Sequence, residues 1–141
     1  MSVFPATTIL LIDGDDNDRI HYAQRLKMCS PDYLVLEARD GRSGMELCES
    51  QKIDCIVTEL DLPDMSAFQL LLDLVPDRQP AVAVVLLAGS FLPAIARLAR
   101  QHGAQACLRK ELTSGDELET VILKSIAAVG STLKEHRLSI Y

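Results

Sequence analysis

Five short apolar runs alternate along the chain with longer segments of helical period, and no other feature restricts the fold as strongly. The runs are TILLID, DYLVLEA, DCIVTE, AVAVVLLAG and AQACLRK, at residues 8–13, 32–38, 54–59, 81–89 and 104–110. A continuous apolar run is typical of a strand that is covered on both faces. Strands that alternate with helices indicate βα units and a parallel sheet. The sequence therefore predicts one α/β domain, a three-layer sandwich with an open, doubly wound sheet of five parallel strands.

Helices are predicted between these strands, over 16–29, 41–50, 66–75 and 91–103, and from about residue 113 onward. In the first helix one apolar face should be buried, made of Ile20, Ala23, Leu26 and Met28. Pro76 and Pro80 should stop the third helix, because proline lacks the backbone N–H that a helix needs. Gly103 should follow the end of the fourth helix as its left-handed residue. The last helix should begin with an N-cap at Thr113, Ser114 or Asp116.

The composition excludes several classes of protein. Hydrophobic residues make up 48% of the 141 residues but aromatic residues only 4%, without Trp, so the core must be aliphatic. The net charge of -6, from 14 basic and 20 acidic residues, argues against a general nucleic-acid binder, which usually has a basic face. No secretory signal opens the sequence, and no apolar run approaches the roughly 18 residues needed to cross a bilayer. We expect a cytoplasmic protein without direct contact to nucleic acid or membrane.

The cysteines and histidines do not suggest a metal site. They lie at irregular spacings without a C-x-x-C pair, at Cys29, Cys48, Cys55 and Cys107 and at His21, His102 and His136. A zinc site would have to be assembled from distant positions, so free thiols in a reducing compartment are the better interpretation. Cys55 and Cys107 lie in apolar runs and are expected in the core.

Charged side chains follow several of the predicted strands. The segments at the strand ends are Asp13-Gly14-Asp15-Asp16, Glu59-Leu60-Asp61, Ala88-Gly89-Ser90 and Arg109-Lys110-Glu111. Carboxyl ends of parallel strands meet at one edge of the sheet, so acids from two strands and a lysine from a third should share one pocket. Such a pocket could hold Mg²⁺, with candidate ligands among Asp13, Asp15, Glu59 and Asp61. The alternative is that polar residues gather there only because solvent begins at strand ends.

Four motifs occur in the order and spacing of a known family. They are ILLID with Arg19 six residues after Asp13, ARDGRSGMEL after the second strand, DCIVTELDLPDM at the third and GAQACLRK at the fifth. Over residues 7 to about 128 the chain resembles the receiver domain of bacterial two-component response regulators. The resemblance implies a flavodoxin-like receiver fold in which an acidic pair binds Mg²⁺ and an aspartate ending the third strand accepts a phosphoryl group from a histidine kinase. It also implies a Thr or Ser after the fourth strand and a lysine after the fifth.

The chain departs from this family pattern at most of the functional positions. Asp13 and Lys110 match, but Gly14 replaces the second acid and Glu59 stands at the phosphoacceptor position. At the two switch positions, Ala88 replaces the Thr or Ser, and Cys107 stands where a Tyr or Phe is common. Asp15 or Asp16 could replace the missing acid only through a rearranged loop.

These departures predict a degenerate site. Glu is one methylene longer than Asp, which moves its carboxylate outward by about 1.5 Å and spoils in-line attack on a phosphodonor. Loss of the acid at Gly14 weakens any Mg²⁺ site, so we expect no cofactor or weak Mg²⁺ at most. Glu59 could instead pair permanently with Lys110 and mimic part of a phosphorylated state.

The expected function is therefore that of an atypical pseudo-receiver, which is not an enzyme and works by protein–protein interaction without phosphorylation. The alternatives are a receiver that accepts a phosphoryl group from a histidine kinase with Mg²⁺, on Glu59 or a neighbouring Asp, and a scaffold without a conformational readout. A flavodoxin-like cofactor binder would need a phosphate cradle after the first strand, whereas the loop DGDDND repels phosphate.

The resemblance also implies partners and a partner surface. The expected partner is a histidine kinase or an output domain, and a homodimer could form through the face of the fourth helix, fifth strand and fifth helix, at about 91–126. We expect the receiver-like domain to occupy residues 1–128, with 129–141 as a helical extension or linker.

Overall fold

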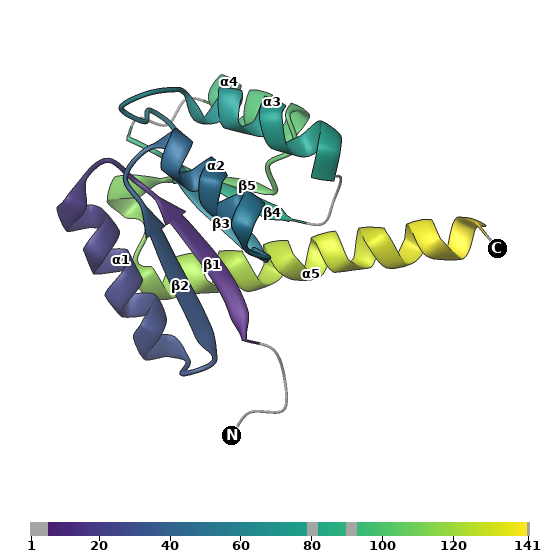
Figure 1. Cartoon of the computed structure of the whole chain (residues 1–141), viewed down its shortest axis with the longest axis horizontal. Helices are drawn as coiled ribbons and strands as arrows, with labels where there is room; N and C mark the ends of the chain where they lie inside the picture. Colours follow the sequence, from purple (N-terminus) through teal and green to yellow (C-terminus); the bar gives the residue numbers. More distant parts are fainter. Residues whose placement is uncertain (1–5, 79–81, 90–92, 141) are drawn as a thin grey trace.

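A parallel sheet of five strands lies between two layers of helices (Figure 1). The computed structural model describes residues 6–78, 82–89 and 93–140, with side chains at all of these except 75–78 and 131–140. The strands are β1 (Thr7–Ile12), β2 (Tyr33–Ala38), β3 (Cys55–Glu59), β4 (Ala83–Ala88) and β5 (Ala106–Arg109). Their order in the sheet is β2-β1-β3-β4-β5, and every neighbouring pair is parallel. The predicted doubly wound α/β fold is confirmed.

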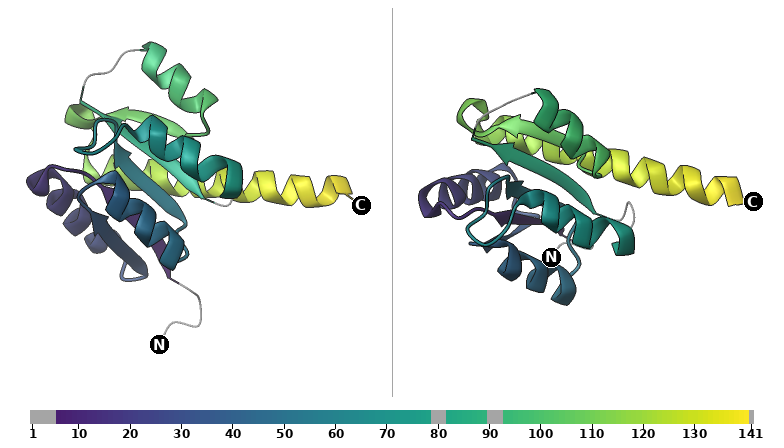
Figure 2. Two further views of the ribbon diagram at one scale, coloured as in Figure 1. Left: turned by 45° about the horizontal axis from the view of Figure 1, so that its top comes forward. Right: turned by 90° about the horizontal axis from the view of Figure 1, so that it is seen from above.

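The helices cover both faces of this sheet, as the views in Figure 2 show. They are α1 (Asp16–Cys29), α2 (Gly41–Ser50), α3 (Ala67–Arg78), α4 (Pro93–Gln101) and α5 (Gly115–Ile140), and a short 3₁₀ turn, η2 (Lys110–Leu112), follows β5. The second half of α5 extends beyond the body of the domain in Figures 1 and 2. Within the described ranges, no helix combines the length and the hydropathy that a membrane crossing requires.

Two aliphatic cores follow from the alternation of side chains along the strands. On β1, Leu10 and Ile12 face the layer of α2, α3 and α4, whereas Ile9 and Leu11 face α1 and α5. This alternation is the two-residue period of a strand, and it explains why both faces of the runs must be apolar. All six residues of β4 are buried. The central strands therefore hold the strand ends in fixed positions at one edge of the sheet.

The buried face of α1 differs from the predicted one. Ala23 and Leu26 are buried as expected, but the prediction for Ile20 and Met28 is wrong, because their side chains are 43% and 74% exposed. Arg19 and Tyr22 are buried in their place. The sequence pattern cannot find this face, because both residues are stabilised there by polar contacts to distant segments, which are described below.

Helix ends follow local rules with one exception. Gly103 has a φ of 104° just after α4, and Ser114 caps α5 by accepting a hydrogen bond from the Glu117 N–H at 3.1 Å. The prediction that Pro76 ends the third helix is wrong, since α3 continues to Arg78. Pro76 has no N–H to donate to the carbonyl of Leu72, four residues back. So close to the helix end this removes only one hydrogen bond, and it does so at an exposed residue. Pro80 lies outside the described residues.

Candidate functional site

The centre of the site is the ammonium group of Lys110, which three carboxylates surround. Lys110 Nζ lies 2.7 Å from Asp13 Oδ2, 2.9 Å from Asp18 Oδ2 and 3.3 Å from Glu59 Oε1. Asp13 follows β1, Asp18 lies in the first turn of α1 and Glu59 ends β3, while Lys110 opens η2 directly after β5. In the sheet β1 and β3 are neighbours, whereas β4 separates β3 from β5. The Lys110 side chain therefore reaches past the end of β4, and residues up to 97 positions apart in the sequence meet at one point.

The burial of the four side chains decreases from the sheet outward. The side chain of Asp13 is 5% exposed and that of Lys110 is 11% exposed, whereas Glu59 and Asp18 reach 23% and 48%. Asp13 Oδ2 accepts no hydrogen bond within the described residues, so its close partner is the ammonium as an ion pair. Beside this cluster lies a cavity of about 350 Å³, also lined by Asp15, His21 and Tyr22.

The first acidic position is fixed by the chain around it. Asp13 Oδ1 accepts a hydrogen bond from the Asp15 N–H at 2.8 Å, and the Asp13 carbonyl accepts one from Arg19 Nη1 at 2.8 Å. Arg19 also pairs with Asp16 and Glu37, which is why a charged side chain can be buried on α1. These contacts leave Asp13 one orientation, with Oδ2 directed at Lys110.

One cation among three acids shifts the titration of the site. Burial raises the pKa of Glu59, the neighbouring Asp13 carboxylate raises it further, and the Lys110 ammonium offsets only part of the change. Burial alone would lower the pKa of Lys110, but Asp13, Asp18 and Glu59 outweigh it and raise that pKa. Lys110 is therefore a permanent cation at neutral pH. Its charge does not fully offset the effects of burial and of Asp13 on the Glu59 carboxylate.

The residues present do not fit the Mg²⁺ that the receiver family implies. Within the described part of the chain, no group of three or more His, Cys, Asp or Glu side chains is arranged to hold a metal ion. Position 14 offers no side-chain oxygen ligand, and an added Cβ at Gly14 would lie 2.8 Å from the Cγ of Pro63. The carboxylate of Asp13 is already taken by Lys110. The proline ring and the ammonium thus fill the space in which a cation and its second acid would lie.

The loop after β3 is fastened to α2. Asp64 accepts hydrogen bonds from the N–H groups of Gly41 at 2.8 Å and Arg42 at 3.0 Å, and Asp40 accepts one from the Ser43 N–H at 2.8 Å. The first free N–H groups of α2 are therefore satisfied, two of them by a side chain of another loop. Met65 lies over Gly41, and its side chain would have to shift to admit a Cβ there. The segment that follows Glu59 is held in one conformation.

The structure brings some of the predicted site residues together and separates others. Asp13, Glu59 and Lys110 meet, but Asp61 is exposed and lies outside the cavity, and Asp15 lines the cavity while capping α1 through the Asp18 N–H. Asp16 pairs with Arg19 and Arg39 instead of replacing the missing acid. At the two switch positions, Ala88 is fully buried, and Cys107 is half-buried against the core.

Two contributors were not predicted from the sequence. Asp18 supplies the third carboxylate, and the hydroxyl of Tyr22 lies 3.1 Å from the Lys110 carbonyl and 2.9 Å from that of Thr113. Both residues lie in the first two turns of α1 and are four positions apart. Their side chains therefore lie on the same face of the helix, the one that contacts the strand ends. This spacing is the only signal in the sequence that could have indicated them.

Comparisons with known proteins agree on the family. The sequence model of the response regulator receiver domain matches residues 9–122. The nitrate/nitrite response regulator protein NarL of Escherichia coli (strain K12) is 30% identical over 121 residues, which cover 86% of this chain and 56% of NarL. The two-component response regulator-like protein APRR5 of Arabidopsis thaliana is 37% identical over 68 residues, or 47% of this chain and 12% of APRR5. The chain thus spans about half of NarL and a small part of APRR5.

A solved structure supports the fold independently. A response regulator receiver domain protein (CheY-like) from Methanospirillum hungatei JF-1 superposes with a TM-score of 0.80 at 19% identity, covering 90% of this chain and 98% of that one. At this identity the likeness shows the fold alone. The family match, in contrast, extends over most of the sequence and includes the ends of β1, β3 and β5. The chain therefore belongs to the response regulator receiver domain family of two-component signalling.

Proposed function

We propose that the chain is an atypical receiver that acts without phosphorylation, as a protein-interaction module and not as an enzyme. The observation that carries this proposal is the saturation of Lys110. Three carboxylates lie within 3.3 Å of its ammonium nitrogen, so its single positive charge is already paired within the chain. In a receiver that is phosphorylated, this lysine must be free to pair with a phosphoryl oxygen. Here that pairing would require the ammonium to leave an acid.

The other positions of the site support the same conclusion. Glu59 carries its carboxylate one methylene further out than an aspartate, which displaces it by about 1.5 Å from the position for in-line attack. Ala88 has no hydroxyl to donate to a phosphoryl oxygen, and Gly14 has no carboxylate. The pair of Glu59 and Lys110 is the contact that would mimic part of a phosphorylated state.

Phosphorylation on Glu59 is the outcome that would overturn this proposal. The purified chain is incubated with acetyl phosphate and Mg²⁺, and separately with beryllofluoride, and followed by intact mass and NMR chemical shifts. We expect no phosphoryl adduct and no shift changes near the end of β3. A stoichiometric, hydroxylamine-labile adduct that is absent from Glu59→Gln would show a phosphorylatable receiver. A receiver domain that is known to accept the phosphoryl group from acetyl phosphate is the positive control.

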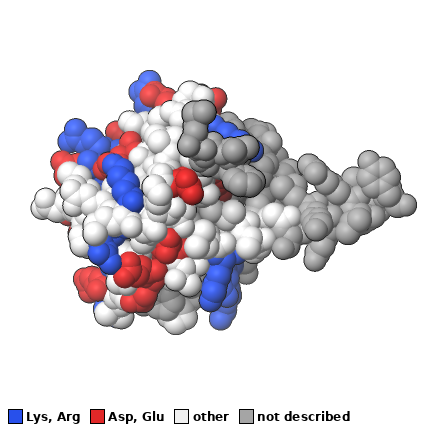
Figure 3. Space-filling model, turned by 90° about the horizontal axis from the view of Figure 1, so that it is seen from below, with Lys and Arg blue, Asp and Glu red and all other residues white. Residues whose placement is uncertain are grey.

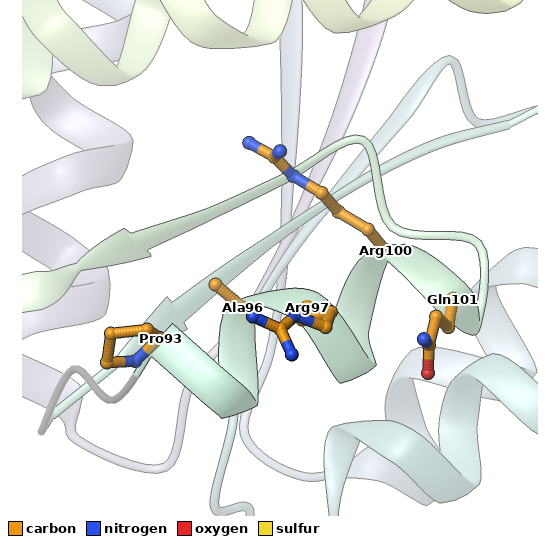
Figure 4. A pocket seen from close by; sticks show the side chains of 5 residues that line it. All are labelled: Pro93, Ala96, Arg97, Arg100 and Gln101. Atoms are coloured by element: carbon orange, nitrogen blue, oxygen red, sulfur yellow. The ribbon is translucent and has the colours of Figure 1, made fainter.

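We propose the face of α4, β5 and α5 as the contact surface for a protein partner, a histidine kinase or an effector domain. On α4 a hollow of about 530 Å³ is lined by Pro93, Ala96, Arg97, Arg100 and Gln101 (Figure 4). No acid lies on α4, and neither arginine has an ion-pair partner among the described residues. Arg97→Glu with Arg100→Glu should abolish partner capture, with Arg42→Glu on α2 as control.

A second copy of the chain is the other occupant that this face could take. Sedimentation of the wild type and of the double arginine variant distinguishes the two cases, since a dimer through α4 should dissociate in the variant. Figure 3 views the molecule from below Figure 1, on the side away from α4, and shows acidic and basic side chains interspersed there. Together with the net charge of -6, this supports a function without direct nucleic-acid contact. Absence of membrane contact, a cytoplasmic location and a domain boundary near residue 128 stay predictions; α5 runs through that boundary as one helix.

A further inference from the structure

We propose that the ammonium of Lys110 takes the place of a divalent cation in this pocket. The native chain then excludes Mg²⁺, and replacing Lys110 by a neutral residue converts the pocket into a binding site for a divalent cation with oxygen ligands. The inference depends on the geometry of the four charged side chains. It does not depend on the signalling role proposed above.

The arrangement around Lys110 is that of a cation with its ligands. Three carboxylate oxygens, from Asp13, Asp18 and Glu59, lie 2.7, 2.9 and 3.3 Å from one nitrogen atom. Asp13 Oδ2 is buried, accepts no hydrogen bond from the described residues and is directed at this point. A buried carboxylate oxygen is stable only beside a positive charge or a donor, and here the ammonium is that charge.

The distances explain why the native pocket does not hold a metal. Oxygen atoms around Mg²⁺ lie at about 2.0–2.1 Å and around Ca²⁺ at about 2.3–2.6 Å, so the present spacing suits an ammonium and is too wide for either ion. A metal ion would have to displace Lys110, whose side chain is only 11% exposed and would leave three ion pairs. The site therefore keeps its own cation.

Removal of the ammonium changes this balance. Three carboxylates then share a pocket without a counter-ion, and their mutual repulsion disfavours the charged forms. A divalent cation relieves that repulsion, and the side chains of Asp18 and Glu59, which are 48% and 23% exposed, have room to move inward by the roughly 0.8 and 1.2 Å that separate their present spacing from Mg²⁺ bond lengths. The adjacent cavity of about 350 Å³ has room for the water molecules that Mg²⁺ retains.

The test measures binding of Mg²⁺, Ca²⁺ and Mn²⁺ to the full chain by isothermal titration calorimetry and by the shift in Tm. We expect no saturable binding to the wild type in the millimolar range, and saturable one-to-one binding with a raised Tm for Lys110→Met. Asp13→Asn in the Lys110→Met background should remove the binding. Lys124→Met, at an exposed position of α5, should behave as the wild type. Lys110→Arg keeps a positive charge in the pocket and should not bind the metals.

Either of two results would overturn the inference. One is saturable, Asp13-dependent binding to the wild type. The other is the absence of binding to a neutral variant that retains the native circular dichroism, with Lys110→Gln as the second variant if Lys110→Met does not fold. The outcomes are separable from those of the proposed function. Metal binding by the wild type without an adduct contradicts only this inference. An adduct on Glu59 that also forms in a parallel incubation with acetyl phosphate but without Mg²⁺ contradicts only the function.

Discussion

Gly14 and Pro63 show how single residues set the shape of the pocket. A Cβ added at Gly14 would lie 2.8 Å from Pro63 Cγ and 3.0 Å from its Cδ, whereas one added at Gly89 meets no atom within 4 Å. Both glycines follow strands at the same edge of the sheet. The receiver pattern places an acid at position 14, so this contact blocks a simple return to that acid.

The contact predicts different costs for the same substitution at the two glycines. Gly14→Ala should lower the free energy of unfolding by about 1–3 kcal/mol, because a rigid proline ring must shift. Gly89→Ala should stay within about 0.5 kcal/mol of the wild type. Urea denaturation followed by circular dichroism measures both, and Pro63→Ala in the Gly14→Ala background should recover most of the loss. Equal costs at the two glycines would show that Pro63 does not restrict position 14.

The pKa of Glu59 predicts a pH dependence of stability. It is raised above the ordinary 4.5 in the folded state, so the folded chain holds this proton more tightly than the unfolded chain does. The stability that this proton contributes is present below pH 4.5 and is lost as the pH rises through the raised value. Glu59→Gln lacks this loss, so its stability relative to the wild type should increase as the pH rises from about 4 to 7.

Denaturation curves of the wild type and Glu59→Gln over that pH range test the direction. Glu49→Gln on the exposed side of α2 controls for a general change in charge. Parallel stability profiles for the wild type and Glu59→Gln would mean that burial and Asp13 do not disfavour the charged carboxylate. A relative loss of stability by the variant with rising pH would mean that Lys110 outweighs both.

At the scale of elements, a single carboxylate joins the loop after β3 to α2. Asp64 binds the N–H groups of Gly41 and Arg42, where an acid also interacts favourably with the helix dipole. Asp64→Ala should therefore lower the free energy of unfolding by about 1–2 kcal/mol. Asp61→Ala is the matched control, since the Asp61 side chain in the same loop is exposed and makes no hydrogen bond or ion pair to a described residue. Chemical denaturation compares them, and equal effects would exclude a cap.

The helices also show which structural features a sequence pattern can predict. The bounds of α1 and α2 follow from local signals in the structure, since Asp15 and Asp40 cap the first turns of these helices. The buried face of α1 does not, because Arg19 and Tyr22 are held by Glu37 and by the carbonyls of Lys110 and Thr113, up to 91 positions away. A pattern within one helix carries no information about such partners.

At the scale of the whole molecule, the site was predictable in its location and not in its internal pairing. Polar residues after parallel strands must meet at one edge, which places Asp13, Glu59 and Lys110 together. The saturation of Lys110 depends on Asp18, which enters from a helix, and on the orientation that Arg19 and Asp15 give to Asp13. These contacts form only when the helical layers pack on the sheet, so the pairing of Lys110 depends on the tertiary structure and not on a local sequence pattern.

The two cores on opposite faces of the sheet share the same strands, and this makes a prediction about cooperativity. Leu70 on α3 and Leu118 on α5 are both fully buried, one in each core. Replacing either by Ala should lower the free energy of unfolding by about 2–5 kcal/mol, because each leaves a cavity. The exposed leucines on the same helices, Leu72 and Leu123, should cost less than about 0.5 kcal/mol.

Because the sheet separates the two cavities, the double variant Leu70→Ala with Leu118→Ala should show the sum of the single losses. Strands that are buried on both faces cannot keep one helical layer when the other is lost, so unfolding should remain one transition with an unchanged dependence on urea. Circular dichroism and NMR signals from each face should have the same midpoint. Two separate midpoints would mean that the helical layers fold as independent units, and that the strand ends forming the pocket are not held by one cooperative structure.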